Sequence, residues 1–204
     1  MSFLVIESGG PQAQAALYTA EQKTVKSGSS AGDQLPVLLK ELLAVVPTEE
    51  PLERIVVARG PGRYTTLRMG IAAALGISVG LSIPCQGVGS WLGVEKAPRY
   101  LIGDAGRMRA YLLQTNAPAE ETERGLKLLE LEEMEVWLAA REPGTVGLLA
   151  PVGRGVESLN LPVFTPSTAE LLRAALALPV GHGPVEPVYP QPAAAIPPAL
   201  KAHA

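Results

Sequence analysis

The sequence predicts an α/β protein built from two similar halves. Its 204 residues are 47% hydrophobic and 18% charged, which is enough to bury one sizeable core or two small lobes. Short runs of branched apolar residues alternate with longer segments of helical periodicity, a pattern typical of sheets covered by helices. Two hairpin-like segments, residues 4–19 and 101–115, resemble each other at a spacing of 97 residues. Such a likeness can arise by chance, but the shared order of elements favours a duplication.

The first half predicts a sheet with a buried parallel part. The turn cluster Glu-Ser-Gly-Gly-Pro between the first two apolar runs indicates a hairpin. In the run at 54–58, apolar and polar residues alternate too little for one face of the strand to be exposed to solvent. The first helix begins at Asp33, a candidate N-cap, and Pro47 ends it. The predicted strands are 3–6, 13–18, 24–27 and 54–58, with a further buried strand from Cys85, and the predicted helices are 33–46 and 65–81.

The second half repeats the order strand, strand, strand, helix, strand, helix. Its predicted strands are 100–104, 110–115, 126–131 and 146–150, and its predicted helices are 132–140 and 168–178. We therefore expect an N-terminal lobe at 1–98 and a smaller C-terminal lobe at 99–178. Proline removes backbone donors and stops helices, so the Pro-rich extension at 179–204 should be extended.

Charge and cysteine content exclude several classes of protein. The net charge of −3 gives the chain no means to hold a polyanion by itself, and the lone Cys85 allows no intramolecular disulfide. The start Met-Ser-Phe-Leu has no basic n-region, so we expect a cytoplasmic protein. No charge occurs from Met69 to Val94, but Pro84 interrupts this stretch before it reaches the ~20 apolar residues of a spanning helix. We expect a buried helix followed by a buried strand, and no membrane contact.

Groups able to carry chemistry are few. Both histidines, His182 and His203, fall in the Pro-rich extension, and Cys85 has no neighbour that would activate it, so no metal site or nucleophile pair is predicted. Glu7 and Asp104 each close a first strand where a hairpin opens. They are either solvated hairpin acids or the acids of a small nucleotide-dependent kinase or hydrolase acting between the lobes. A peptidase is a weaker alternative, because no metal triad supports it.

The segment 60–68, Gly-Pro-Gly-Arg-Tyr-Thr-Thr-Leu-Arg, predicts a tight turn from a strand into a helix. Thr65 can cap this helix, and its N-terminus could receive an anion or nucleotide with help from Arg63, Arg68 and Glu7. A purely structural turn explains the same residues, and the sequence does not separate the two interpretations.

The two N-lobe helices carry the strongest physical signal. The first is apolar around most of its circumference, and the second has no charge after Arg68, so a single sheet cannot cover both. We expect another chain to cover them, unless the C-terminal extension folds back over the same surface. The predicted partner-binding residues are Leu35, Leu38, Leu39, Leu42, Leu43, Val46, Gly70, Ile71, Ala73, Ala74 and Ile77.

Four segments then point to a family. They are Leu4-Val-Ile-Glu-Ser, Arg54-Ile-Val-Val-Ala-Arg-Gly-Pro-Gly-Arg-Tyr-Thr-Thr-Leu-Arg-Met-Gly-Ile-Ala-Ala-Ala-Leu-Gly, Ile83-Pro-Cys-Gln-Gly-Val-Gly-Ser and Asp104-Ala-Gly-Arg. Together they resemble the TsaB (YeaZ) family of bacterial threonylcarbamoyladenosine-biosynthesis proteins over residues 4–189. The stretch 60–76 is similar to that family's Gly-Pro-Gly-Ser-Phe-Thr-Gly-Leu-Arg-x-Gly motif. Glu7 stands where the family usually has Asp.

The resemblance implies a duplicated actin-like, ribonuclease-H-like fold. It also implies a non-catalytic role in the complex that forms N6-threonylcarbamoyladenosine beside the anticodon of tRNAs reading codons that begin with A. The expected direct partner is TsaD, the metal-bearing catalytic paralogue, bound through the N-lobe helices, and the ATPase TsaE joins that pair. The complex uses ATP and Mg, whereas this chain alone is expected to bind no cofactor and to meet tRNA only through the complex. Without its partner it should form a homodimer.

Overall fold

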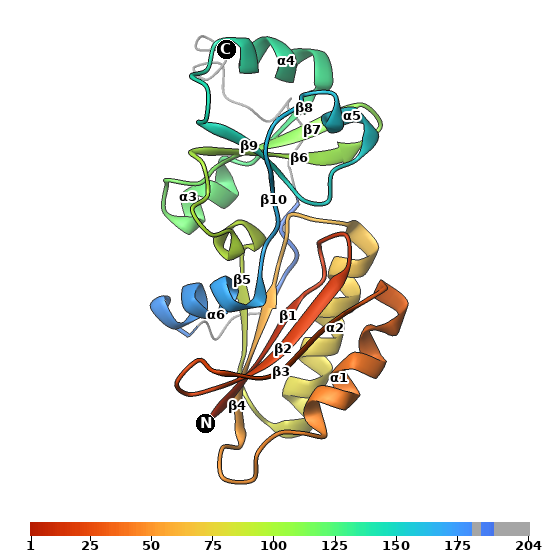
Figure 1. The fold of residues 1–204 in the computed structure, drawn as a ribbon, viewed down its shortest axis with the longest axis vertical. Helices are drawn as coiled ribbons and strands as arrows, with labels where there is room; N and C mark the ends of the chain where they lie inside the picture. The colour runs from red at the N-terminus through yellow and green to blue at the C-terminus, as the bar shows by residue number, and fades with distance from the viewer. Residues whose placement is uncertain (181–184, 190–204) are drawn as a thin grey trace. The chain divides into compact units, whose positions relative to one another are not determined.

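The computed structural model describes residues 1–180 and 185–189, and the chain divides into two compact units. The first unit comprises Met1–Glu95 and Pro166–Pro187, and the second is built on Lys96–Thr165. Each unit holds one five-stranded sheet (Figure 1). The break after Glu95 lies close to the boundary predicted at residue 98. Most of the predicted extension, 179–204, lies outside the described residues.

The sheet of the first unit has the strand order β3-β2-β1-β4-β5. Its strands are β1 (Ser2–Glu7), β2 (Ala13–Thr19), β3 (Thr24–Ser30), β4 (Leu52–Ala58) and β5 (Cys85–Val88). The pairs β1–β2 and β2–β3 are antiparallel, while β4 runs parallel to both β1 and β5. Strand β1 is buried along its whole length, which explains why its apolar run shows no alternation. The predicted hairpin and the predicted parallel part are both confirmed.

Helices cover both faces of this sheet. Helices α1 (Leu35–Leu43) and α2 (Tyr64–Leu81) lie on one face, and α6 (Thr168–Ala177) lies on the other (Figure 1). Successive side chains of a strand point to opposite faces, so Leu4 and Ile6 pack with α1 and α2, while Phe3 and Val5 pack with α6. The first unit is therefore a three-layer α/β/α structure.

The predicted helix at 65–81 is confirmed, but the one at 33–46 is shorter than expected. Asp33 lies in the short 3-10 helix η1 (Gly32–Gln34) and is not the N-cap of α1. Helix α1 instead starts with Pro36 in its first turn, a position where a missing backbone N–H costs nothing. A second 3-10 helix, η2 (Ser90–Gly93), follows β5.

The second unit repeats this sheet topology, with the strand order β10-β9-β6-β7-β8. Its strands are β6 (Tyr100–Gly106), β7 (Arg109–Gln114), β8 (Lys127–Glu130), β9 (Val146–Leu149) and β10 (Val163–Phe164). Its helices are α3 (Ala119–Arg124), α4 (Leu131–Ala139) and α5 (Arg154–Glu157). The hydrophobic core joins Met134 and Trp137 of α4 to Ile102 and Leu148 of the sheet.

The duplication predicted from the sequence is confirmed by the order of the strands. Read from β8 to β10, the second sheet has the same sequence of neighbours and the same parallel and antiparallel pairs as the first sheet from β3 to β5. Glu7 and Asp104 occupy matching places in β1 and β6. In each case a carboxylate oxygen accepts a hydrogen bond from the amide two residues on, that of Gly9 or Gly106.

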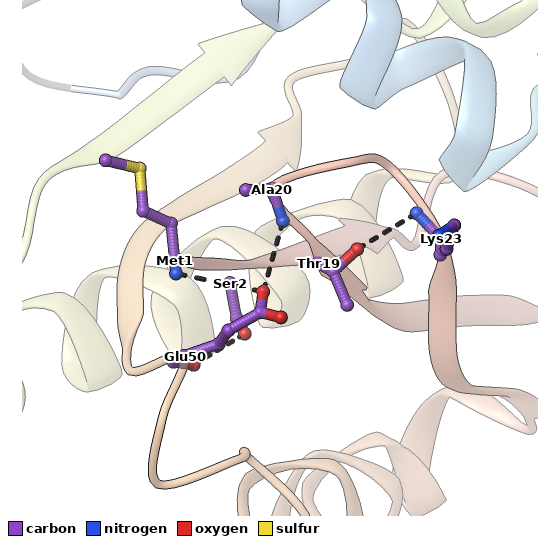
Figure 2. A network of polar contacts seen from close by, with 6 residues as sticks. All are labelled: Met1, Ser2, Thr19, Ala20, Lys23 and Glu50. Carbon is purple, nitrogen blue, oxygen red and sulfur yellow. Dashed lines mark hydrogen bonds and ion pairs between the residues drawn. The ribbon is translucent and has the colours of Figure 1, made fainter.

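A polar network fixes the starting end of β1 in the first unit. Glu50, in the loop between α1 and β4, accepts hydrogen bonds from Ser2 Oγ to its carbonyl oxygen (2.7 Å) and from the Ala20 amide to its Oε2 (3.4 Å) (Figure 2). The N-terminal amine of Met1 lies 3.8 Å from the same Oε2. The loop before β4 is thus tied to the end of the sheet that is opposite Glu7.

One domain assignment differs from the prediction. Helix α6 was expected in the C-terminal lobe at 99–178, yet its Leu171, Leu172 and Ala175 pack on the sheet of the first unit. Two buried polar contacts hold it there. The hydroxyls of Tyr18 and Thr168 share a hydrogen bond of 2.8 Å, and Gln86 Nε2 donates to the carbonyl oxygen of Ala175 (3.0 Å).

We predict that Gln86→Leu lowers the free energy of unfolding by about 1–3 kcal/mol, because it removes the side-chain hydrogen bonds that join β5 to the end of α6. In the native protein Gln86 Nε2 donates to the carbonyl oxygens of Ala175 and Pro179, and its Oε1 accepts from Arg54. Urea unfolding followed by circular dichroism measures the loss. The control Gln12→Leu changes an exposed glutamine and should stay within about 0.5 kcal/mol of the parent. Equal stability of the two variants would contradict the assigned role of Gln86.

Candidate functional site

Helix α2 leaves one long side uncovered by the described chain. This side, termed here the outer face of α2, consists of Met69, Ala72, Leu75, Gly76, Val79 and Gly80, all of them exposed. Val79 is 80% exposed, and a Cβ atom added to Gly76 or Gly80 would meet nothing within 4 Å. The apolar residues of this face are therefore open to solvent in the described part of the chain.

The opposite side of α2 is packed on the first sheet. Leu67, Gly70, Ile71 and Ala74 are buried there. Gly70 is required for this contact, because a Cβ atom at that position would overlap Ser8 Oγ at the end of β1. The expectation that a single sheet cannot cover α2 is confirmed, because the described part of the chain buries its inner side alone.

The same packing corrects the predicted partner-binding residues. Six of them lie in the core of this chain and cannot contact a partner without unfolding: Leu35, Leu39, Leu42, Gly70, Ile71 and Ala74. The others are half-buried at the edges of α1 and α2: Leu38, Leu43, Val46, Ala73 and Ile77. A helix that is apolar on nearly every side does not reveal which side faces the sheet. The sequence did contain a signal for the outer face. The small residues Ala72, Gly76 and Gly80 recur every four positions, a spacing that allows another helix to approach closely.

Helix α1 has a different outer side. Val37 is exposed, but its neighbours Lys40 and Glu41 are also exposed, and Glu41 forms an ion pair with Lys26 of β3 at 3.1 Å. The uncovered apolar surface of the first unit is therefore concentrated on α2. The alternative was that the C-terminal extension covers these helices, but most of that extension lies outside the described residues. Within the described part, Val185 packs into the hydrophobic cluster beneath α1 and α2.

Helix α2 is also the one described helix that is long and apolar enough to cross a membrane, with 18 residues and a mean hydropathy of 1.3. The evidence for a membrane span is the length and composition of the helix alone. Its inner side fits the first sheet, and Arg68 lies in its second turn, stacked 5.2 Å from the centre of the Tyr64 ring. The structure thus shows α2 as a helix of a three-layer unit with an apolar outer face.

The turn after β1 forms a second candidate site, centred on Glu7. Its side chain is 1% exposed, and its Oε1 accepts hydrogen bonds from the amides of Gly9 (2.6 Å) and Gly10 (3.2 Å). Its other oxygen, Oε2, is buried without a hydrogen-bond partner, as is Ser90 Oγ at the start of η2. A buried carboxylate oxygen without a partner is costly, so the site needs either a proton or a bound group there.

Burial raises the pKa of the Glu7 carboxyl above its ordinary value. The Gly9 amide, the Ser90 hydroxyl and the Gly10 amide offset part of this effect. Ser90 is thus close enough to influence the carboxyl electrostatically, yet its Oγ makes no hydrogen bond of normal geometry. Since Glu7 is sealed from solvent in this structure, it is poorly placed to contact a nucleotide.

The predicted anion contacts around residues 60–68 are only partly brought together. Arg63 is the N-cap residue of α2 and its amide donates to Gly9 O (3.0 Å), while its side chain is exposed. Arg68 Nη1 donates to the hydroxyl of Tyr64 (2.5 Å). Thr65 is exposed inside the helix and does not cap it, which corrects that prediction. The structural interpretation of this turn accounts for every contact that the structure shows.

The remaining candidates are Asp104, the two histidines and Cys85. Asp104 is half-buried, and residues 1–180 and 185–189 contain no group of three His, Cys, Asp or Glu side chains that could hold a metal ion. Both histidines lie outside the described residues. Burial raises the pKa of the Cys85 thiol to about 11, so it stays protonated and unreactive near neutral pH.

Comparison with known proteins gives a consistent picture. Residues 30–124 match the model of the TsaD family, tRNA N6-adenosine threonylcarbamoyltransferase. An uncharacterized protein from Pseudomonas aeruginosa with similarity to peptidase YeaZ is 18% identical, with a TM-score of 0.63 over 93% of this chain and 99% of that one. YeaZ from the same organism is 18% identical, with a TM-score of 0.61 over 92% of this chain and 99% of its own. A search of proteins with curated descriptions gave no match.

The segment that matches the TsaD family runs from the end of β3 through α3 and so includes both α1 and α2. The likeness to the two Pseudomonas structures extends over nearly the whole chain and concerns its fold. On the duplicated sheet topology and the structural likeness, this chain has the α/β fold of the two YeaZ-like structures, and its residues 30–124 are similar in sequence to the TsaD family.

Proposed function

We propose that this chain is a non-catalytic subunit of the machinery that forms N6-threonylcarbamoyladenosine next to the anticodon of tRNAs reading codons that begin with A. In this proposal it binds a TsaD-type transferase and stabilises the active conformation of that protein. The observation that carries the proposal is the uncovered apolar outer face of α2, with Val79 80% exposed. Desolvating such a surface against a partner is favourable, at roughly 25 cal/mol per Å² of apolar area.

The position of the family match supports this choice of partner. The residues similar to the transferase family, 30–124, contain the helix that carries the uncovered face. Two chains that share this helix and its sheet present surfaces of the same kind, and such surfaces pair about a two-fold or pseudo-two-fold axis. We propose the same face for self-association when the transferase is absent.

Further components follow from the proposal. A TsaE-type ATPase joins the pair, the assembled complex uses ATP and Mg, and this chain meets tRNA only within the complex, in the cytoplasm. The net charge of −3 is consistent with a subunit that does not hold RNA by itself. The alternative, a small kinase or hydrolase acting through Glu7 and Asp104, is less well supported because Glu7 is only 1% exposed.

We predict that Val79→Asp weakens binding to the TsaD protein of the same organism at least tenfold, about 1.4 kcal/mol or more, because a charge would be buried in the apolar contact. The same change should convert the isolated chain from dimer to monomer in size-exclusion chromatography with light scattering. Affinity is measured by titration calorimetry on the purified proteins.

The matched control for this experiment is Val136→Asp. Val136 is 71% exposed on α4, a helix of the second unit, so the substitution has the same chemistry at a similarly exposed site. It should bind and self-associate as the parent does. Both variants change exposed positions and should keep the parental fold, which circular dichroism spectra check. Unchanged binding by Val79→Asp would exclude the outer face of α2 as the contact.

We predict that the isolated chain hydrolyses ATP no faster than a protein-free blank, since the described residues contain no cluster of metal ligands and Glu7 is sealed from solvent. A coupled phosphate-release assay with Mg present measures this rate. Turnover above the blank that disappears in Glu7→Gln would establish the alternative enzyme, and binding to the transferase would then need another explanation.

A further inference from the structure

Glu7 sits where three segments of the first unit meet. Its Oε1 receives the amides of Gly9 and Gly10 in the turn after β1. That turn is in direct contact with the turn before α2, because Gly9 O accepts from the Arg63 amide (3.0 Å) and a Cβ atom on Gly62 would lie 2.6 Å from Gly9 Cα. The turn before α2 is in turn bonded to η2, since the Ser90 amide donates to the carbonyl oxygen of Gly60 (2.8 Å). The carboxyl group thus lies at the centre of the junction that starts α2.

No opposite charge compensates this carboxyl. Of the charged side chains on the segments around it, Arg63 is exposed, Arg68 donates to the Tyr64 hydroxyl, and Arg59 at the end of β4 donates to the carbonyl oxygen of Glu186 (3.4 Å). Its cross-strand neighbour on β2, Gln14, is neutral. The groups that influence the carboxyl are neutral amides and the Ser90 hydroxyl.

Burial without an opposite charge favours a neutral carboxylic acid over a carboxylate at Glu7. One oxygen, Oε1, accepts two amide hydrogens as a carbonyl oxygen does, while Oε2 is buried and receives no donor. A charge on Oε2 would be buried here without an opposite charge beside it, whereas a protonated Oε2 is neutral and has the unpartnered Ser90 Oγ available as an acceptor. Nothing else in the described surroundings supplies the missing partner.

We propose that Glu7 is a proton-dependent latch, which in its neutral form holds the turn after β1, the turn before α2 and η2 together, and which loosens this junction when it loses its proton. The latch acts on the position of the first turn of α2. It does not depend on the proposed partner or on tRNA modification, so either inference can fail without the other.

The direction of the pH effect follows from the burial of the carboxyl. Because burial raises the pKa of Glu7, the folded protein holds this proton more tightly than the unfolded chain does. The stability that the neutral form contributes is fully present below the ordinary glutamate range. It is lost as the pH rises through the raised pKa of the folded state.

The first experiment compares melting temperatures of the parent and Glu7→Gln between about pH 5 and about pH 8. Glutamine copies the neutral acid in shape, so the parent should fall below Glu7→Gln progressively as the pH rises. The control Glu50→Gln removes a carboxylate whose side chain is 38% exposed and should keep the pH trend of the parent. Parallel curves for the parent and Glu7→Gln would overturn the latch.

The second experiment needs no variant and decides the matter if Glu7→Gln fails to fold. In nuclear magnetic resonance spectra of the ¹⁵N-labelled parent, the amide signals of Gly9 and Gly10 should titrate together, with a midpoint above the ordinary range of glutamate. The amide of Arg63 should follow with the same midpoint, since it donates to Gly9 O. A midpoint in or below the ordinary range would overturn the proposal.

A bound cation is the competing explanation for the unpartnered oxygen. In that case MgCl₂ or NaCl at matched ionic strength would raise the melting temperature of the parent selectively for one ion, and Glu7→Gln would abolish that rise. Such a result would replace the proton by a metal ion and overturn the latch. We expect the two salts to act equally on both proteins.

Discussion

The close contact between α2 and the end of β1 determines which side of the most apolar helix remains uncovered. Only a glycine at position 70 permits this contact, since a Cβ atom there would overlap Ser8 Oγ. Once Gly70 and Ala74 face the sheet, Gly76 and Val79 must point away from it, because they lie on the other side of the helical turn. Which side of α2 remains uncovered is therefore a consequence of how closely the helix approaches its own strand.

Helix α6 is the reason why the other face of the sheet cannot take up the apolar surface of α2. It covers the face of the sheet that α1 and α2 leave free, held by Leu171 and Leu172 in the core and by the contact between Gln86 and Ala175. The central strand β1 is then buried on both sides, and each face of the sheet already has a helix packed on it. Any cover for the outer face of α2 must come from beyond the three layers of this unit.

The sequence was sufficient for the fold class and insufficient for the orientation of α2. Continuous apolar strands, a hairpin cluster and the repeat at 97 residues predicted two covered sheets with the same topology, as found. Those signals are local, or compare one half with the other. The side of α2 that faces the sheet depends on the close approach at Gly70, and the placement of α6 depends on contacts between residues such as Tyr18 and Thr168, which are 150 positions apart. Periodicity contains neither kind of information.

The two halves also show how a duplicated position can acquire different surroundings. Glu7 and Asp104 both accept a hydrogen bond from the amide two residues on. Around Glu7, the close contact of Gly9 with Gly62 and the presence of η2 exclude water, whereas Asp104 stays half-buried. The neighbouring turns, more than the acid itself, therefore decide whether this position is a half-buried acid or a sealed group that responds to protons. A substitution in the turn before α2 that admits water to Glu7 should lower the pKa of its carboxyl group, because water relieves the cost of burying the charge.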